Sequence, residues 1–188
     1  MGRLIYSMIT SLDGYVSGPD GGFDWALDPA LHDFITEEFA GVGTYLYGRR
    51  MYETMVYWET AHLEPGQPQE GIDYARVWQA ADKIVFSSTL SEVSSARTRI
   101  EREFDPETVA RWKAESDRDF TVDGPTLAAE AIRAGLVDEF GVFIGPGIVG
   151  GGLPFFPTGV HVDLELKDDR RFESGVMYLR YEVVRPEL

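Results

Sequence analysis

The stretch "DFTVDGPTLAAEAIRAGLVDEFGVFIG", from Asp119 to Gly145, carries the clearest architectural signal in this chain. Its first part, residues 119–124, is an apolar run that predicts a buried strand. Residues 125–135 predict a helix, with a proline in its first turn and Gly135 as its C-cap. A second apolar run over residues 136–145 predicts another strand. A strand, a helix and a second strand in this order indicate a parallel sheet in an α/β protein.

The same alternation of strand and helix signals continues along the rest of the chain. Strands are predicted at residues 3–10, 43–48 and 83–88, and helices at residues 30–39, 49–58, 74–81 and 106–116. Residues 64–71 predict a loop, and the charged segment 94–103 leaves its element type open. The last segment, 160–184, alternates around a turn at Glu173–Gly175, which predicts an antiparallel hairpin. We therefore expect one α/β domain over residues 1–188, with a mostly parallel sheet and an antiparallel C-terminal edge.

Composition excludes several classes of function. The formal net charge of −15 argues against a nucleic-acid or anionic-membrane partner, because both reward clustered positive charge. The chain has 0 cysteines, which removes disulfides, thiolate zinc sites and cysteine nucleophiles, and we predict no metal site. The N-terminus lacks the long apolar region of a signal peptide, and no apolar run reaches the roughly 20 residues that span a bilayer. We expect a cytoplasmic protein.

Gly145, Gly147 and Gly150 form a literal G-x-G-x-x-G directly after an apolar run. In a dinucleotide-binding turn, the third glycine opens a helix whose first amides face the phosphates. Here two further glycines follow, and then Pro154 and Pro157, through which no helix propagates. We reject this match as a cofactor site and look for one elsewhere.

Polar loops follow four of the predicted strands, at the sheet edge where α/β proteins bind ligands. The loops are "TSLDGYVSG" (10–18), "YGRRMYET" (47–54), "VFSSTL" (85–90) and "TVDGPTLAAEAI" (121–132). Arg49 and Arg50 begin a helix, where cations are unfavourable unless an anion such as phosphate is bound. A salt bridge to neighbouring carboxylates would explain these arginines equally well, and plain turns or helix caps would explain the other loops. Three of these loops, at residues 47–54, 85–90 and 121–132, suit phosphate, and three such loops on one sheet favour a nucleotide site.

In this order, the segments "SLDGYVSG", "YGRRMYET", "KIVFSS", "TVDGPTLAAEAIRAGLVDEF" and "GPGIVGGGLPFF" resemble the dihydrofolate-reductase-like superfamily. The branch they resemble most is the stand-alone relatives of the reductase domain of bifunctional riboflavin-biosynthesis proteins. The resemblance implies a three-layer α/β fold, NADPH as cofactor and a homodimer. It places at the cofactor Met8, Ile9, Asp13, Val16, Ser17, Gly48, Arg49, Arg50, Met51, Phe86, Ser87, Ser88, Asp123, Gly124, Pro125, Thr126 and Leu127.

On the substrate side, the resemblance implies a carboxylate on the first long helix that assists protonation. Asp28, His32 and Asp33 are the candidates; Asp28 also fits as the helix N-cap, and we choose Asp33, although a solvated helix carboxylate is an alternative. Trp25 and Tyr52 are expected to stack on a flat heterocycle.

One departure from the superfamily concerns the pyrophosphate contact. Its members usually have Gly-Gly, often joined by a cis bond, where this chain has Asp123-Gly124. An aspartate there places a carboxylate near the pyrophosphate unless it points away or pairs with a cation. In the same branch, residues 146–156 are a characteristic loop, and we expect Phe155 and Phe156 to pack back into the core.

The expected function is an NADPH-dependent reductase that transfers a hydride to a small pyrimidine or pterin-like heterocycle. Reduction of 5-amino-6-(5-phosphoribosylamino)uracil in riboflavin biosynthesis is one candidate. The alternatives are dihydrofolate reductase activity and a non-catalytic, nucleotide-binding descendant of the fold.

Overall fold

The computed structural model describes residues 1–22 and 29–185 of the chain. In these ranges one sheet has the strand order β5-β4-β3-β6-β1-β7-β10-β9. Its strands are β1 Leu4–Thr10, β3 Val42–Gly48, β4 Asp82–Phe86, β5 Thr98–Glu101, β6 Asp119–Asp123, β7 Glu139–Ile144, β9 Leu164–Arg171 and β10 Met177–Val183. The strands from β5 to β7 are parallel, whereas β10 runs antiparallel to β7 and to β9. The expected mostly parallel sheet with an antiparallel hairpin is confirmed.

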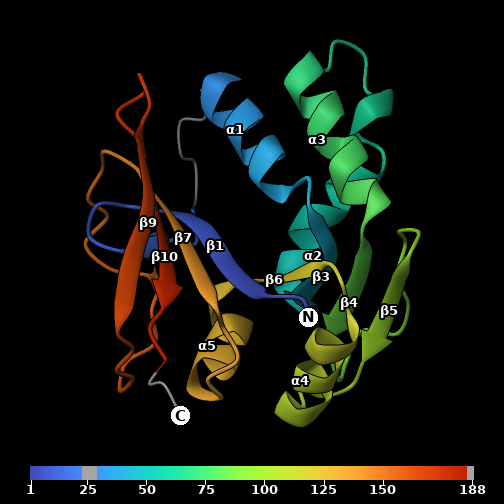
Figure 1. Cartoon of the computed structure of the whole chain (residues 1–188). Helices are drawn as coiled ribbons and strands as arrows, with labels where there is room; N and C mark the ends of the chain where they lie inside the picture. The colour runs from blue at the N-terminus through green and yellow to red at the C-terminus, as the bar shows by residue number, and fades with distance from the viewer. Residues whose placement is uncertain (23–28, 186–188) are drawn as a thin grey trace.

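Helices cover both faces of the sheet, which gives three layers (Figure 1). One face packs against α1 (Pro29–Phe39), α2 (Arg49–Met55) and α3 (Gln69–Ala80). The other packs against α4 (Pro106–Glu115) and α5 (Pro125–Arg133). Two short 3-10 turns, η1 (Val56–Glu59) and η2 (Ala61–Leu63), connect α2 to α3. No helix in the described part of the chain is long and apolar enough to cross a bilayer.

The chain leaves the neighbouring strands β3 and β6 in opposite directions. After β3 it passes through α2 and α3 to β4, and after β6 it passes through α5 to β7. In the sheet, β4 and β7 lie on opposite sides of the β3–β6 pair, and the two connections use opposite faces. Such a switch point opens a crevice outside the carboxyl ends of the two strands, which is where α/β sheets bind ligands. The topology alone therefore locates a candidate site.

Side chains along β6 alternate between the two faces, as the pleat of a strand requires. Phe120 and Val122 belong to the core cluster under α4 and α5. Thr121 and Asp123 consequently point to the opposite face, where α3 packs. In the β3–β6 register Asp123 pairs with Tyr47, which belongs to the core cluster around α3. An acidic residue thus lies on the inner side of a helical layer.

Several boundaries differ from the sequence-based expectation. The helix predicted at residues 74–81 begins earlier, at Gln69, because its polar first turn carries no apolar periodicity and Pro68 is its N-cap. The helix predicted at 49–58 ends at Met55 and continues as a 3-10 turn. The segment with an open element type contains the edge strand β5.

Helix α5 ends at the glycine that the sequence predicts as its C-cap. Gly135 has a φ of 66°, and its N–H donates to the Ile132 carbonyl, while the Leu136 N–H donates to the Ala131 carbonyl. These two bonds form a Schellman motif, which satisfies the last carbonyls of the helix. Strand β7 begins only at Glu139, after this turn is complete.

Candidate functional site

The N-termini of α2 and α5 meet at the switch point. The residue before each helix is a glycine, Gly48 or Gly124, so neither helix has a side-chain cap, and neither first turn contains an acid. Gly124 has a φ of 94°, and a Cβ added there would lie 3.3 Å from the Cβ of Met51 in α2. Glycine therefore permits the close approach of the two helices. Uncapped helix N-termini carry free amides and partial positive charge, which suits an anion.

The two arginines at the start of α2 have different environments. Arg49 Nε lies 2.7 Å from Glu53 Oε1, and its Nη1 donates to Thr89 Oγ1 at 3.0 Å. Arg50 is exposed and makes no side-chain hydrogen bond or ion pair with the described residues. The salt-bridge explanation thus applies to Arg49, whereas Arg50 is left available to a ligand. The Arg49–Glu53 pair is itself exposed, so a competing anion has only a weak contact to displace.

The loop after β4 is built mainly by Ser87. Its Oγ accepts the N–H groups of Leu90 at 3.0 Å and Thr89 at 3.3 Å, and it is buried. The Ser87 hydroxyl therefore stabilises a turn, as the alternative of a plain turn or cap predicts. Ser88 is exposed at the same loop, and Phe86 packs edge-on against Phe104 with 5.3 Å between ring centroids.

The loop after β1 is tied to the glycine stretch. The Asp13 carboxylate accepts the N–H of Val149 at 3.1 Å and of Gly150 at 2.8 Å. A hydrogen bond from Ser11, together with these amides, lowers the pKa of Asp13 below its usual value. Asp13 thus joins two loops that lie about 136 positions apart in the chain.

A second contact joins the same two loops. The short strands β2 (Tyr15–Ser17) and β8 (Leu153–Pro154) pair in an antiparallel ribbon. A Cβ on Gly152 would lie 2.1 Å from the Ser17 carbonyl oxygen, so only glycine fits there. This close approach is what the glycines permit. Among the cofactor residues predicted nearby, Val16 is buried in the core, and Met8 and Ile9 are partly buried against it.

Phe155 and Phe156 follow the glycines and differ in burial. Phe155 is 1% exposed and stacks on Tyr6, with 4.2 Å between ring centroids. The Tyr6 hydroxyl also donates to the Phe155 carbonyl at 3.0 Å. Phe156 is 45% exposed. The expectation of core packing is confirmed for Phe155. It holds in part for Phe156, whose half-exposed ring contacts the buried rings of Phe155 and Phe140 at centroid distances of 4.6 and 5.5 Å.

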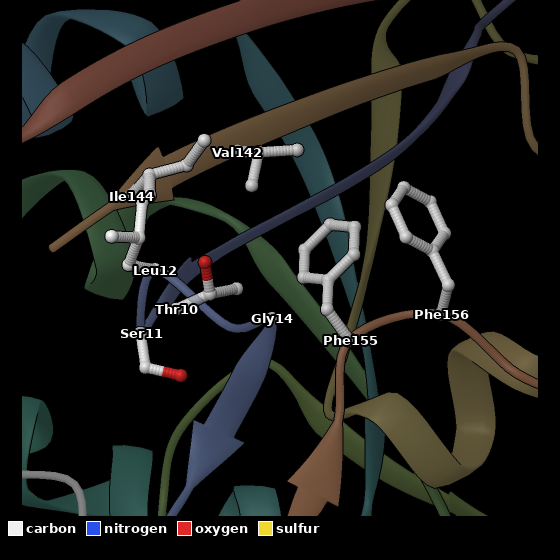
Figure 2. Close-up of a pocket in the computed structure, with 8 residues that line it drawn as sticks. All are labelled: Thr10, Ser11, Leu12, Gly14, Val142, Ile144, Phe155 and Phe156. Atoms are coloured by element: carbon white, nitrogen blue, oxygen red, sulfur yellow. The ribbon is translucent and has the colours of Figure 1, made fainter. Parts of the chain in front are cut away.

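A small hollow opens at the ends of β1 and β7 (Figure 2). Val142 and Ile144 lie across it from Thr10 and Ser11, and Phe155 stands at its side. Leu12, Gly14 and Phe156 complete its lining. Its volume is about 160 Å³, close to the ~150 Å³ of a cavity that binds benzene. This hollow accommodates one ring and is too small to be the whole site of a dinucleotide and a second heterocycle.

Asp123 points away from the anion site. Its side chain is on the α3 face and the residue is 6% exposed, and Thr121 Oγ1 donates to its Oδ2 at 2.6 Å. Burial raises the pKa of Asp123 to about 7, although the Thr121 hydrogen bond acts in the opposite direction. The peptide bond to Gly124 is trans. The carboxylate that the sequence places next to the pyrophosphate contact therefore lies inside the protein.

The assignment of Asp33 on the first helix as proton donor stays a prediction. Asp33 is exposed on α1. His32 is partly buried, with its ring edge-on to Tyr74 and Trp58 at centroid distances of 5.8 and 6.0 Å. Its buried Nδ1 has no hydrogen-bond partner in the part of the chain that the structure describes. Asp28 falls outside the described residues.

Of the two predicted stacking residues, Tyr52 and Trp25, the structure describes only Tyr52. Tyr52 is buried, and its hydroxyl lies 3.0 Å from Ser95 Oγ and accepts the Ser94 N–H at 2.9 Å. It therefore supports the core and does not line the crevice. Trp25 falls outside the described residues. The remaining predicted residues, Pro125, Thr126 and Leu127, form the first turn of α5 at the anion site.

The fold and the crevice define a three-layer α/β protein with a candidate anion-binding site at the switch point of its sheet. The chain matches the family described as "RibD C-terminal domain" over residues 3–178 and belongs to that family. YyaP of Bacillus subtilis (strain 168), described as uncharacterized, is 28% identical over 187 residues, which are 95% of this chain and 94% of YyaP.

Solved structures share the fold. A protein of Shewanella sp. PV-4 named for riboflavin biosynthesis has a TM-score of 0.76 at 19% identity, over 97% of this chain and 99% of that one. A diaminohydroxyphosphoribosylaminopyrimidine deaminase/5-amino-6-(5-phosphoribosylamino)uracil reductase of Thermotoga maritima has a TM-score of 0.68 at 15% identity. The match covers 97% of this chain and 57% of the Thermotoga protein. The present chain therefore corresponds to about half of that bifunctional protein.

Proposed function

We propose that this protein is an NADPH-dependent reductase of a pyrimidine or pterin-like heterocycle, with the ribosylaminouracil intermediate of riboflavin synthesis as one candidate substrate. The observation that carries the proposal is the meeting of two uncapped helix N-termini at the switch point, beside Arg50, whose side chain has no partner among the described residues. Free amides and a guanidinium group together suit the phosphates of a dinucleotide. Membership of the RibD C-terminal domain family supports a reductase.

In this proposal, separate residues of the site bind the pyrophosphate and the 2′-phosphate of the dinucleotide. The first turn of α5, from Pro125 to Leu127, offers amides to the pyrophosphate, and Gly124 lets the phosphates approach the backbone. Arg50 holds the 2′-phosphate that distinguishes NADPH from NADH. Arg49 joins it by exchanging its exposed contact with Glu53 for the ligand. When bound, the reduced nicotinamide supplies a hydride, and the protein supplies orientation and a proton.

The test compares the two cofactors in arginine variants. Titration calorimetry with NADPH and NADH on the wild type, Arg49→Ala, Arg50→Ala and the double variant measures the phosphate contact directly. We expect Arg50→Ala to weaken NADPH by roughly 10- to 100-fold, the value of a charged hydrogen bond, with little effect on NADH. Arg76→Ala serves as control, because Arg76 is an exposed arginine on α3 that pairs with Asp73. Equal weakening of the two cofactors would refute the contact.

A specific observation favours a second candidate, a nucleotide-binding descendant without reductase activity. The α1 carboxylate expected by analogy with dihydrofolate reductases, Asp33, is exposed, as the alternative of a solvated helix carboxylate predicts. The same observation lowers the case for dihydrofolate reduction. Following NADPH consumption with a panel of pyrimidines and pterins separates the candidates. Tight NADPH binding without turnover of any of them would favour the non-catalytic descendant.

A further inference from the structure

We propose that Arg102 is a further specificity-determining residue of the dinucleotide site, where it binds the 2′-phosphate of NADPH together with Arg50. The inference rests on the proposed function, because it concerns the same cofactor. Arg102 directly follows β5, in the segment whose element type the sequence leaves open. Three observations support this role: its place at the sheet edge, its side-chain contacts and the distribution of charge along that edge.

Arg102 stands at the same edge of the sheet as the predicted cofactor loops. It follows the carboxyl end of β5, which runs parallel to β4. The Ser87 N–H donates to the Glu101 carbonyl at 2.9 Å, so Arg102 begins beside the loop that follows β4. Strand β3, which leads into the two arginines of α2, is the next neighbour of β4. Three adjacent parallel strands therefore bring Arg102, the loop after β4 and the start of α2 together.

The Arg102 side chain holds the loop after β4 with only part of its guanidinium group. Its Nη1 donates to the Leu90 carbonyl at 2.7 Å and to the Ser87 carbonyl at 3.2 Å. Within residues 1–22 and 29–185, its Nε and Nη2 have no partner, and no carboxylate pairs with it. The N–H groups of Nε and Nη2 lie side by side on the planar guanidinium group. They form a fork that suits two oxygens of one phosphate.

The same loop contacts a second arginine and offers hydroxyl groups. Arg49 Nη1 donates to Thr89 Oγ1 at 3.0 Å, so the loop lies between the guanidinium groups of Arg49 and Arg102. The Thr89 hydroxyl accepts this bond and still has its own proton to donate. Ser88 is exposed beside it. A phosphate on this loop would therefore receive hydroxyl and guanidinium donors together.

Charge along the edge favours one direction for the dinucleotide. Strand β6, which leads into α5, lies between β3 and β1. Toward β5 the edge carries Arg49, Arg50 and Arg102, whereas the loops after β1 and β7, residues 11–22 and 145–163, contain no lysine or arginine. With the pyrophosphate on α5, the phosphorylated adenosine lies on the side of β5. The uncharged reduced nicotinamide then lies on the side of β1 and β7.

Spacing along the edge decides which phosphate Arg102 contacts. Its Nη1 is held at the loop after β4, and β4 is two strands away from β6. At ~4.8 Å between neighbouring strands, this separation is roughly 10 Å. A pyrophosphate bound at the first turn of α5 is therefore beyond hydrogen-bond distance of Arg102. The phosphate left for Arg102 is the 2′-phosphate of the adenosine, which NADPH has and NADH lacks.

The experiment is titration calorimetry with NADPH, NADH, adenosine 2′,5′-bisphosphate and AMP. Arg102→Met removes the charge and keeps a long side chain, whereas Arg102→Lys keeps the charge and removes the fork. Arg111→Met is the matched control, because Arg111 is an exposed arginine on α4 whose Nη2 donates to Thr108 Oγ1 at 3.2 Å.

We expect Arg102→Met to weaken NADPH and the bisphosphate roughly 10-fold, the value of one charged hydrogen bond, and to leave NADH and AMP unchanged. Arg102→Lys should retain part of the preference for NADPH, because its ammonium group keeps the charge. Added salt should shrink the difference between wild type and Arg102→Met for NADPH, since the contact is exposed. Arg111→Met should bind all the ligands as the wild type does.

Two outcomes would overturn the role of Arg102 alone. One is equal weakening of all the ligands by Arg102→Met, which would mean that Arg102 only supports the loop. The other is unchanged NADPH affinity in Arg102→Met while Arg50→Ala loses it. Failure of the wild type to bind NADPH would instead overturn the proposed function, and the role of Arg102 with it.

Discussion

Replacing Asp123 with Asn changes one buried titratable group while keeping its size and its ability to accept the Thr121 hydrogen bond. The substitution therefore isolates the contribution of this group to the pH dependence of stability. An unfolded aspartate has a pKa of about 3.9. In the folded protein, burial raises the pKa of Asp123 to about 7. Between these values the folded state binds the proton more tightly than the unfolded state does.

The sign and size of the effect follow from proton linkage. The contribution of the neutral Asp123 to the free energy of unfolding is fully present below the unfolded pKa. It is lost as the pH rises through the folded pKa. A difference of about 3 pKa units, at about 1.4 kcal/mol per unit, corresponds to a loss of ~4 kcal/mol from the wild type. Asn does not titrate, so Asp123→Asn should escape this loss. Its advantage should grow by about 1.4 kcal/mol per pH unit and level off above the folded pKa.

Urea unfolding followed by tryptophan fluorescence, from about pH 5 to about pH 8, measures the free energy of unfolding of both proteins. Taking the difference between wild type and variant at each pH removes the contributions of the other carboxylates. Curves that stay parallel across this range would refute the reasoning, because the folded pKa of Asp123 would then equal its unfolded value. Glu130→Gln should give such parallel curves, since Glu130 is exposed.

Five further substitutions test the loops around the crevice. Phe155→Ala should cost about 3–5 kcal/mol of unfolding free energy, because its ring is buried against the core, and Phe156→Ala should cost clearly less by the same urea assay. Gly152→Ala should lower the thermal midpoint more than Gly14→Ala, because both have positive φ but only position 152 has backbone within contact distance of a Cβ. Asp13→Ala should speed hydrogen exchange at the amides that it binds in the glycine stretch, and unchanged protection there would contradict the loop contact.

Much of this architecture can be predicted from local sequence. The run from Asp119 to Gly145 forms a strand, a helix and a strand, because apolar periodicity and the glycine stop act over a few residues. The order of polar loops after the strands also carries the family resemblance. The sequence reading missed β5, the start of α3 and the ribbon of β2 with β8. The first two have weak periodicity, and the ribbon pairs segments far apart in the chain.

The residues of the site depend more strongly on the tertiary structure. Sequence places Arg49 and Arg50 together, but only the structure shows that Arg49 has partners in Glu53 and Thr89, whereas the Arg50 side chain has none within residues 1–22 and 29–185. Sequence leaves Asp123 either facing a phosphate or pointing away, and the pleat of β6 turns it inward. Both outcomes depend on neighbours that the strand order brings together.

The sequence of this protein determines its elements, its charge and its family, because these follow from short-range patterns and from residue types. The tertiary structure alone decides that β6 lies beside β3, which creates the switch point and brings two helix N-termini together. It also decides that the Asp123 carboxyl group is buried beside Thr121, while the Asp13 carboxylate is held by backbone amides. The physical reason is that dielectric environment and hydrogen-bond partners come from contacts between distant segments, which no local pattern encodes.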